Sequence, residues 1–398
     1  MFVYADHSAT SPLRPAAREA MMPFLTEEYG NASSLYQLAR RAKIALENAR
    51  QSIARCLDCD ASEVLFTSGG TEADNWALKS VMCERKPDGG HLIVSAVEHA
   101  AIMETAAYLR KKGRQVTFLP VDENGVVSPA ALKDALQPDT KLVSIMMANN
   151  EVGTLQDIQA LAAVARQAGV LFHTDAVQAA GHCPLSFRDL GVDMLSLSAH
   201  KFGGPKGIGA LLVRKGLSLV PLLHGGGHEK GRRSGTENVA GAVGMAAALE
   251  ESVASLAQST QTLLSLTKQL DEGILAIPYA FKTGHPTQRL PGHCSYVFEA
   301  VEGESLVLNL DAHGICVSSG SACSSSTLEP SHVLLAVGIP QEVAHGSLRL
   351  SLGEQNTREQ VAYVVEKLTQ VIAGKRAMSP LWDEAEQKPL IRFWDRED

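Results

Sequence analysis

The sequence lacks the features of a secreted, a membrane or a nucleic-acid-binding protein. Its seven cysteines are an odd number scattered over 398 residues, which is unlike a disulfide framework and favours reduced thiols in a cytoplasm. The N-terminal stretch MFVYADHSATSP has no basic head followed by an apolar run, so we expect no signal peptide. We see no uninterrupted apolar segment long enough to cross a bilayer. The net charge of −8, without a long basic run, argues against nucleic-acid binding.

Metal-binding patterns are also sparse. Cys56 and Cys59 form a single C-x-x-C at the end of a helical pattern, where the helix dipole does not favour a thiolate. A second pair that would complete a zinc site is absent from the sequence. His224 and His228 are spaced by glycines rather than set on a helix. We therefore interpret the two cysteines as structural and expect no metal at the two histidines.

What the sequence does have is an alternation of short apolar runs with helical patterns. Several runs are apolar without polar alternation, as strands buried on both faces should be. This predicts an α/β protein with a mostly parallel sheet covered by helices, followed by a smaller C-terminal α/β domain. We expect an N-terminal segment at 1–14 that packs with the small domain, a large domain at 15–255, a small domain at 256–378 and a charged tail at 379–398. The apolar runs are EVLFTS, HLIVSAVEH, VTFLPV, KLVSIMMANN, VLFHTDAVQ, MLSLSAH and GALLVR.

Polar residues follow these runs at equivalent positions. Ligands of parallel sheets bind outside the C-terminal ends of the strands. One polar strand end is routine, but so many of them predict a shared site. The residues are Ser68, His99, Asn149, Asn150, Asp175, Gln178, His200 and Lys201.

Lys201 is the most informative of them, because it directly follows a buried apolar run in SLSAHKFGGPKGIGALLV. Burial disfavours the charged ammonium and leaves the amine able to form an imine with a carbonyl compound. The glycines beyond it let the backbone approach a bulky ligand. On this segment alone, a surface lysine in a glycine-rich turn is an equally good interpretation.

Three further features fit one cofactor. Gly70 and Thr71 lie between a strand and a helix, where free amides and the helix dipole form a phosphate cup, although a plain helix cap is the alternative. Asp175 ends a buried strand and could pair with a protonated pyridine nitrogen, or be a structural carboxylate. His99 could stack on an aromatic ring, or be a hydrogen-bonded core histidine. A phosphate cup, a stacking ring, a pyridinium partner and an imine-forming lysine are the parts that pyridoxal 5′-phosphate requires.

Two residues in the C-terminal third suit a substrate. Cys323 lies among serines and glycines in SSGSACSSS, which predicts an accessible thiol able to act as a nucleophile, or an incidental loop cysteine. Arg349 shares a strand face with Ser347 and Ser351 and suits a carboxylate, although a solvent-facing charge on an edge strand fits the pattern equally well.

As a set, these residues resemble the cysteine desulfurases, in the NifS/IscS-like branch of the class V aminotransferase family. The resemblance covers nearly the whole chain. It is specific because of the combination FTSGGTEADN, VEH, ANNEVGT, HTDAVQ, SAHK, GRRSGTEN and SSGSACSSS. Two departures are Ala32, where the family has proline, and Tyr36, where it often has histidine. The tail does not resemble the segment with which housekeeping members dock their scaffold.

The resemblance implies a homodimeric fold-type-I enzyme dependent on pyridoxal 5′-phosphate, which converts L-cysteine to L-alanine. The sulfur would go to Cys323 as a persulfide, for delivery to an iron–sulfur scaffold or another sulfur acceptor, and Cys323 could transiently ligate an iron–sulfur cluster. Alternatives are a selenocysteine lyase, another lyase or an aminotransferase of the same fold, a non-catalytic scaffold and, weakest, a nucleotide-binding module. The resemblance implies that Lys201 is the Schiff-base lysine, that His99 stacks on the ring and transfers a proton, and that Asp175 contacts the ring nitrogen. It implies that Asn150 and Gln178 contact the ring oxygen region, that Asn150 also contacts the substrate, and that Arg349 binds the substrate carboxylate. The residues implied to bind the phosphate are Gly70, Thr71, Ser198, His200 and, from the partner subunit, Thr236.

Overall fold

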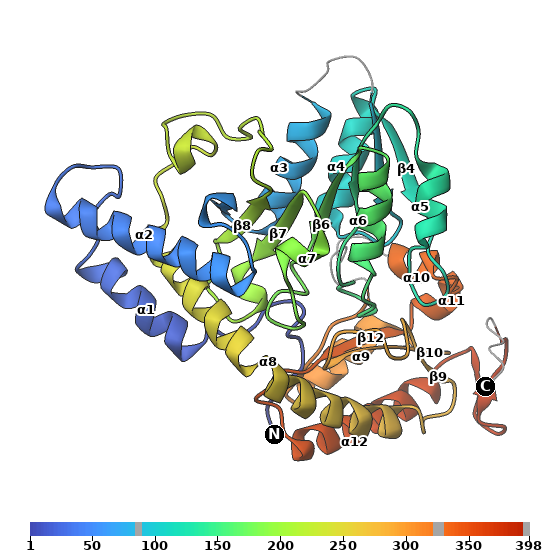
Figure 1. Ribbon diagram of the computed structural model, residues 1–398. Coiled ribbons are helices and arrows are strands. Elements are labelled where there is room, and N and C mark those ends of the chain that lie inside the picture. Colours follow the sequence, from blue (N-terminus) through green and yellow to red (C-terminus); the bar gives the residue numbers. More distant parts are fainter. Residues whose placement is uncertain (84–89, 321–329, 393–398) are drawn as a thin grey trace.

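A seven-stranded sheet lies at the centre of the larger part of the molecule (Figure 1). The computed structural model describes residues 1–83, 90–320 and 330–392. Strand β8 is antiparallel to its neighbours β2 and β7, and the other strand pairs are parallel, which confirms the mostly parallel sheet. In sheet order the strands are β2 (Val64–Thr67), β8 (Gly209–Val213), β7 (Met194–Ser198), β6 (Leu171–Asp175), β5 (Thr140–Ser144), β3 (His91–Ser95) and β4 (Gln115–Leu119).

The strands are buried on both faces, as their continuous apolar sequences predict. Successive residues alternate between two cores: Phe66 and Leu212 contribute to one, and Leu65 and Leu211 to the other. The first core includes residues of α2 and α6, and the second includes residues of α3 and α4, so helices cover both faces. The helices of this part are α1 (Pro15–Thr26), α2 (Gln37–Cys56), α3 (Gly70–Met82), α4 (Ala100–Lys111), α5 (Pro129–Ala135), α6 (Ile158–Gln167) and α7 (Phe187–Leu190), with 3-10 turns η1 (Ala61–Glu63), η2 (Ala199–Lys201) and η3 (Glu229–Gly231).

The smaller part is built on a three-stranded antiparallel sheet, β12–β10–β9, with a core of its own. Its strands are β9 (Ala280–Lys282), β10 (His293–Phe298) and β12 (Ser347–Ser351), with α9 (Gly303–Ala312), α10 (His332–Ala336), α11 (Gln341–Ala344) and α12 (Arg358–Arg376). A hairpin of β13 (Trp382–Asp383) and β14 (Lys388–Pro389) follows. In this hairpin Trp382 packs edge-on against Tyr279, with ring centroids 5.8 Å apart, so the described part of the tail is docked on the small domain.

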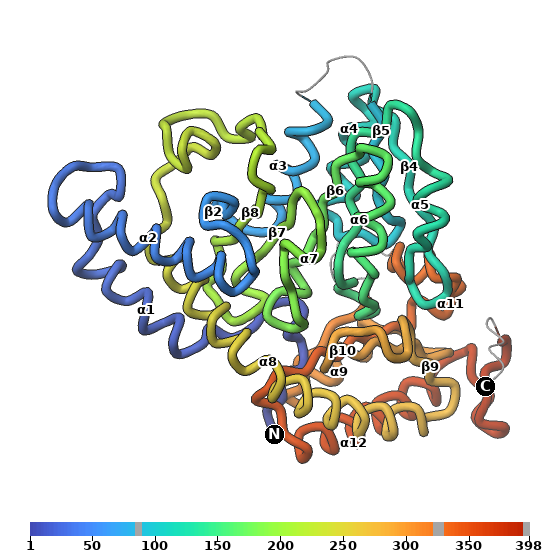
Figure 2. The backbone as a smooth tube through the Cα atoms, viewed as in Figure 1, coloured from blue at the N-terminus to red at the C-terminus, as the bar shows by residue number. Residues whose placement is uncertain are grey.

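Helix α8 (Val239–Ile274) links the two parts as one continuous helix, visible as the tube in Figure 2 that passes from α1 and α2 to α12. Position 255, where we expect the large domain to end, lies inside it. By length and composition α8 is apolar enough to span a bilayer, which corrects the expectation of no such segment. In this fold 56% of the most apolar stretch of α8 is buried, and helices in protein cores have the same length and composition.

The first residues of the chain cross to the small domain. Strand β1 (Val3–Tyr4) pairs in parallel with β11 (Ile315–Cys316), and Asp6 forms a bridge with Ser351 of β12. The chain then returns to the large domain, where the Ser11 amide donates to the carbonyl of His200 over 2.9 Å. The N-terminal segment therefore lies between the two cores, beside the C-terminal ends of the parallel strands.

Candidate functional site

A cavity of about 310 Å³ lies at the C-terminal ends of the parallel strands, where the sequence predicts a site. Strand ends and helix starts of the large domain supply most of its lining, and β12 of the small domain supplies Arg349. The structure brings together these predicted residues: Gly70, Thr71, His99, Asn150, Asp175, Gln178, Ser198, His200, Lys201 and Arg349.

Lys201 ends η2, which directly follows β7, and its amine reaches the N-terminal segment. Its Nζ donates to the backbone oxygen of Ser8 over 2.5 Å and to that of Ala9 over 3.0 Å. The Ser8 oxygen also accepts from Nε2 of Gln178 over 2.9 Å. A backbone carbonyl from the far end of the chain therefore sets the position of the lysine amine.

Asp175 is the last residue of β6 and is 5% exposed. Its Oδ1 accepts from the Val177 amide over 2.8 Å, which fixes the carboxylate plane and leaves Oδ2 for another donor. Burial raises the pKa of Asp175, and the nearby charges of His99 and Lys201 lower it. A cation placed against Oδ2 would keep this carboxylate ionised.

Asp74 on α3 is a second buried carboxylate that lines the cavity, and it was absent from our sequence-based predictions. Its Oδ1 has no hydrogen-bond partner among the described residues and lies 3.7 Å from Nε2 of His173. Burial, and then the charge of Asp175, raise the pKa of Asp74 well above its ordinary value. The raised pKa favours the protonated form of Asp74 next to Asp175.

His99 is the N-cap of α4, and its Nδ1 accepts from the Ala101 amide over 3.2 Å. Because an acceptor nitrogen carries no hydrogen, the proton of the neutral ring lies on Nε2. Burial lowers the pKa of His99, which favours the neutral form. The neutral ring thus has a fixed tautomer beside Asp175 and Lys201, with Nε2 as its hydrogen-bond donor.

The start of α3 forms an anion cradle opposite β7. No described side chain caps this helix, so its first amides are available to a ligand. A Cβ atom on Gly70 would lie 2.7 Å from Cγ2 of Val177, so only glycine lets the backbone lie this deep. Burial lowers the pKa of His200 to about 4, which makes it a neutral donor or acceptor beside the cradle.

These groups fit pyridoxal 5′-phosphate. Amides and hydroxyls at the start of α3 suit its phosphate, the open Oδ2 of Asp175 suits a protonated ring nitrogen, and Lys201 suits its aldehyde. Two observations support the fit. Gly70 lets the start of α3 lie close to Val177, and the buried Asp175 uses only Oδ1 for the Val177 amide, which leaves Oδ2 for a protonated ring nitrogen.

Arg349 is 3% exposed, so the interpretation as a solvent-facing charge is wrong. Its Nη1 donates to the backbone oxygen of Asn150 and its Nη2 to Oδ1 of Asp6, each over 2.9 Å. Its Nε has no partner among the described residues. A buried, partly unpaired guanidinium on the cavity wall is suited to a substrate carboxylate.

Some predicted residues lie elsewhere. Cys323 falls outside the described residues. Thr236 lines a separate cavity of about 170 Å³, together with Arg233 and Glu229. Asn149 is buried behind the site, where its Oδ1 accepts from the amides of Glu151 and Val152.

Sequence reasoning missed several residues of the cavity: Ser8, Ala9, Asp74, Met146 and Val177. Ser8 and Ala9 act through backbone oxygens, which every residue has, so no side-chain pattern could reveal them. The sequence could have indicated Asp74. This carboxylate lies on a largely apolar helix, one turn after the phosphate cup, and such a position is a candidate for a buried site.

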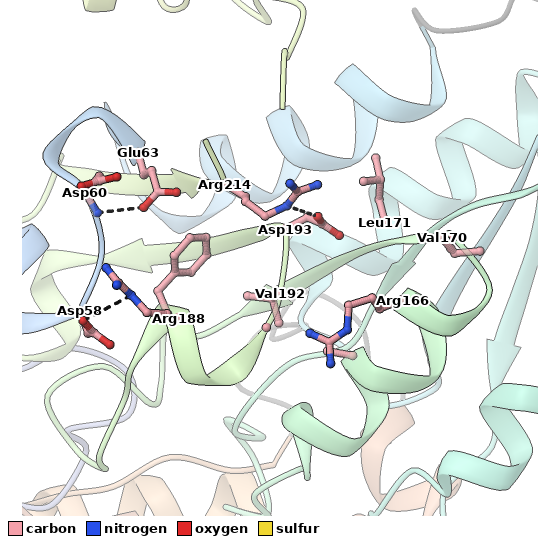
Figure 3. A pocket seen from close by; sticks show the side chains of 14 residues that line it. Asp58, Asp60, Glu63, Arg166, Val170, Leu171, Arg188, Val192, Asp193 and Arg214 are labelled. Carbon is pink, nitrogen blue, oxygen red and sulfur yellow. Dashed lines mark hydrogen bonds and ion pairs between the residues drawn. The ribbon is translucent and has the colours of Figure 1, made fainter. Parts of the chain in front are cut away.

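A larger cavity, of about 700 Å³, lies at the opposite ends of the strands, beside the starts of β6 and β7 (Figure 3). Its charged side chains largely bind one another: Arg214 donates to Asp193 over 2.7 Å, and Arg188 lies 3.7 Å from Asp58. Nothing there resembles the chemistry of the Lys201 cavity. Nearby, burial raises the pKa of Cys56 to about 11 and that of Cys59 to about 12, which agrees with structural roles.

Comparison with known proteins gives a consistent result. Residues 3–364 match the family model described as aminotransferase class-V. The cysteine desulfurase IscS of Methanosarcina thermophila is 51% identical over 379 residues, which cover 95% of this chain and 94% of that protein. The solved structure of a NifS-like protein has a TM-score of 0.89 at 38% identity and covers 94% of this chain and 100% of its own. SspA in complex with cysteine has a TM-score of 0.80 at 33% identity, covering 89% and 100%.

Proposed function

The chain belongs to the cysteine desulfurases of the aminotransferase class-V family, and on that premise we propose that it converts L-cysteine to L-alanine and takes the sulfur on Cys323. One observation carries the proposal: a lysine amine, a fixed histidine, a buried aspartate and a glycine-rich helix start line one cavity, and a buried arginine completes its wall. A solved relative is described as a complex with cysteine, which supports L-cysteine as the substrate.

Enzymes of this family depend on pyridoxal 5′-phosphate, which when bound withdraws electrons from the α-carbon of an amino acid. Gly70, Thr71, Ser198 and His200 would hold its phosphate, and Asp175 its ring nitrogen. His99 would lie against the ring face. Lys201 would carry the covalent link, and Asn150 and Gln178 would lie beside the ring oxygen.

Arg349 orients the substrate. Its Nη1 and Nη2 are held by Asn150 and Asp6, so the fork is fixed before a ligand arrives and little side-chain entropy is lost on binding. A carboxylate paired with this guanidinium would direct the rest of the amino acid towards Lys201. Lys201, as a free amine, is then the group able to take a proton from the substrate carbon and return it, and the N–H at His99 Nε2 is a hydrogen-bond donor beside it.

Cys323 would accept the sulfur. Its thiolate forms the new S–S bond as the carbon–sulfur bond of L-cysteine breaks, and the electron pair of that bond stays on the carbon skeleton. A proton delivered to the carbon completes L-alanine. The balance is one L-cysteine and one thiol giving one L-alanine and one persulfide, with no external oxidant or reductant.

We propose further that the enzyme works as a homodimer. Large apolar side chains are exposed on and beside α1 and α2, where a second subunit would cover them: Met22, Leu25, Leu35, Tyr36 and Ile44 are each at least 48% exposed. The placement of Thr236 outside the Lys201 cavity supports its action in the partner subunit's site. Light scattering should give twice the mass of the chain, and a monomer at micromolar concentration would refute the proposal.

The sulfur acceptor would be an iron–sulfur scaffold or another thiol protein in the cytoplasm. No disulfide joins any two of the six cysteines among the described residues, which supports a reducing compartment. The described residues contain no group of three metal ligands, so a transient cluster at Cys323 would need ligands from the acceptor. Cell fractionation tests the location, and iron–sulfur reconstitution with candidate scaffolds tests delivery.

The central test is the reaction itself. The purified holoenzyme should form L-alanine and a persulfide in equal amounts from L-cysteine, and Cys323→Ser should keep the cofactor absorbance and lose the persulfide. Wild-type sulfide release from that variant would exclude Cys323 as the acceptor. A selenocysteine lyase would instead act on L-selenocysteine and fail on L-cysteine, and an aminotransferase would require a keto acid.

A further inference from the structure

Glu151 is a buried carboxylate to which the proposed reaction assigns no role. It is 6% exposed and directly follows Asn150, whose backbone oxygen accepts from Arg349. The turn that carries it is rigid, because Oδ1 of Asn149 accepts from the amides of Glu151 and Val152, each over 2.8 Å. The carboxylate therefore starts from a fixed backbone at the wall of the cavity.

The side chain of Glu151 reaches the start of α10. The Ser331 hydroxyl donates to its Oε2 in a short hydrogen bond, and the same hydroxyl oxygen accepts from the amides of Val333 and Leu334 over 3.1 and 3.2 Å. One serine therefore caps α10 and joins it to the large domain. Burial raises the pKa of Glu151 to about 7, against the lowering effects of the Ser331 hydrogen bond and the Arg349 charge, so the bond to Ser331 gains the strength of a charged acceptor above that pH.

Two other contacts hold α10 at the same place. Nε2 of His332 lies 3.1 Å from the backbone oxygen of Glu98, beside His99. Val333 and Leu334 belong to an apolar cluster that includes Val97 and Val152 of the large domain. In Figure 1, α10 is the orange helix at the boundary between the two parts.

The backbone of Glu151 is also linked to the catalytic lysine. Its oxygen lies 2.9 Å from Nε2 of His293, and Nδ1 of that ring lies 2.9 Å from Oγ of Ser8. Because a carbonyl only accepts, Nε2 carries the proton and the Ser8 hydroxyl donates to Nδ1. The backbone oxygen of the same Ser8 accepts from Lys201, so the chain of contacts runs from Ser331 to the lysine.

The position of Ser331 matters because of the sequence before it. Cys323 lies three positions after Gly320 and eight before Ser331. The Gly320 amide donates to Oγ of Ser347 over 3.1 Å, so one end of the intervening chain is fixed to the small domain. The bond between Ser331 and Glu151 fixes the chain after the other end to the large domain, so Cys323 lies in sequence between an attachment to each domain.

We propose that Glu151 is a positioning residue for sulfur transfer, which holds Ser331, and with it the end of the Cys323 segment, in register with the backbone that supports Arg349. This inference rests on the proposed role of Cys323. It predicts that Glu151 and Ser331 act as a unit on the transfer step, while cofactor binding and the affinity for L-cysteine stay within about twofold of wild type.

The test uses full-length holoenzymes of wild type, Glu151→Ala, Glu151→Gln, Ser331→Ala, Ser331→Thr and the double alanine variant. After rapid mixing with equimolar L-cysteine, the persulfide on Cys323 is followed by peptide mass spectrometry. We expect each single alanine variant to form it about tenfold more slowly. At pH 8, above the pKa of about 7 to which burial raises Glu151, Glu151→Gln should lose about threefold because it keeps an acceptor without the charge, and Ser331→Thr should restore the wild-type rate. The double variant should be no slower than the singles.

Ser128→Ala is the matched control, because Ser128 caps α5 in the same way, through the Ala130 amide, without a bond to Glu151. A wild-type rate in Ser331→Ala, the same loss in Ser128→Ala, or effects that multiply in the double variant would each overturn the inference.

A second measurement does not depend on turnover. Alkylation of Cys323 by iodoacetamide, without L-cysteine, should change in rate at least about threefold in Glu151→Ala and Ser331→Ala, and stay unchanged in Ser128→Ala. If wild type alkylates at Cys323 but forms no persulfide, the proposed function fails and this comparison still decides the role of Glu151. Equal alkylation in all variants would overturn that role.

Discussion

Asp6 and Arg349 lie 343 positions apart in the sequence and form an ion pair with an oxygen–nitrogen distance of 2.9 Å. The arginine side chain is 4% exposed and that of the aspartate 16%, so little water screens the pair. Asp6 therefore holds Arg349, the residue that we propose binds the substrate carboxylate, although Asp6 does not itself line the Lys201 cavity.

Replacing Asp6 should show this. Asp6→Ala leaves a buried cation without its partner, so the free energy of unfolding should fall by up to about 3 kcal/mol and the KM for L-cysteine should rise roughly tenfold. Urea unfolding and steady-state kinetics measure the two effects. The control is Glu366→Ala, which breaks an exposed pair with Lys367 and should leave the free energy of unfolding close to that of wild type. An unchanged KM in Asp6→Ala would show that Arg349 holds its position without Asp6.

The cradle at Gly70 allows a rescue experiment. In Gly70→Ala the new Cβ would lie 2.7 Å from Cγ2 of Val177, so the start of α3 must move. Overpacking of this kind costs about 1–3 kcal/mol, and we expect the Kd for pyridoxal 5′-phosphate to rise roughly tenfold. Removing the opposing methyls in Gly70→Ala/Val177→Ala should restore most of the affinity. Titration of the apoprotein, followed by absorbance, gives both values, and failure of the rescue would point to a cause other than this contact.

Lys201→Ala tests the covalent link. Borohydride reduction of the wild-type holoenzyme should add the mass of the reduced cofactor to the peptide that contains Lys201. The variant should gain no such mass at any lysine, although Gly70, Asp175 and His99 should still bind the cofactor. Arg214→Ala, in the cavity at the opposite ends of the strands, should retain the adduct. A reduced adduct on another lysine in the variant would assign the covalent link to that lysine instead of Lys201.

Glu98 should make stability depend on pH. Burial raises its pKa to about 8 from 4.5, so the folded state favours the protonated acid. Its contribution is fully present below pH 4.5 and is lost as the pH rises towards about 8, since the unfolded carboxyl ionises first. Glu98→Gln keeps an oxygen for Ser95 and for the Met146 amide, so its stability should exceed that of wild type increasingly over this range. Urea unfolding at pH 5 and pH 8 measures it, and a constant difference between the two proteins would contradict the prediction.

The large sheet could be predicted from the sequence because its signal is local. Each strand is a short apolar run that must be buried on both faces, and Leu65 and Phe66 show how adjacent residues fill opposite cores. The polar strand ends were predictable for the same reason, since parallel strands bring their C-terminal ends to one edge. Lys201, Asp175 and His99 all lie in the cavity as expected.

What the sequence could not reveal depends on distant or backbone contacts. The backbone carbonyl of Ser8 accepts a hydrogen bond from Lys201, and the identity of the side chain does not predict such a contact. The partner of Arg349 lies at the other end of the chain, so strand periodicity could not distinguish a buried fork from an exposed charge. The expected boundary at 255 falls inside α8, because one unbroken helix serves both cores and its composition does not change at the border.

The N-terminal strand has a consequence for biosynthesis. Val3 pairs with Ile315 and Asp6 with Arg349, so Val3 and Asp6 must wait for partners that are synthesised much later. At about 5–20 residues per second, that delay is roughly 17–70 seconds. A nascent chain can thus form its large sheet long before Arg349 is present to bind a substrate carboxylate. A ribosome-bound fragment without Arg349 should therefore release no sulfur from L-cysteine.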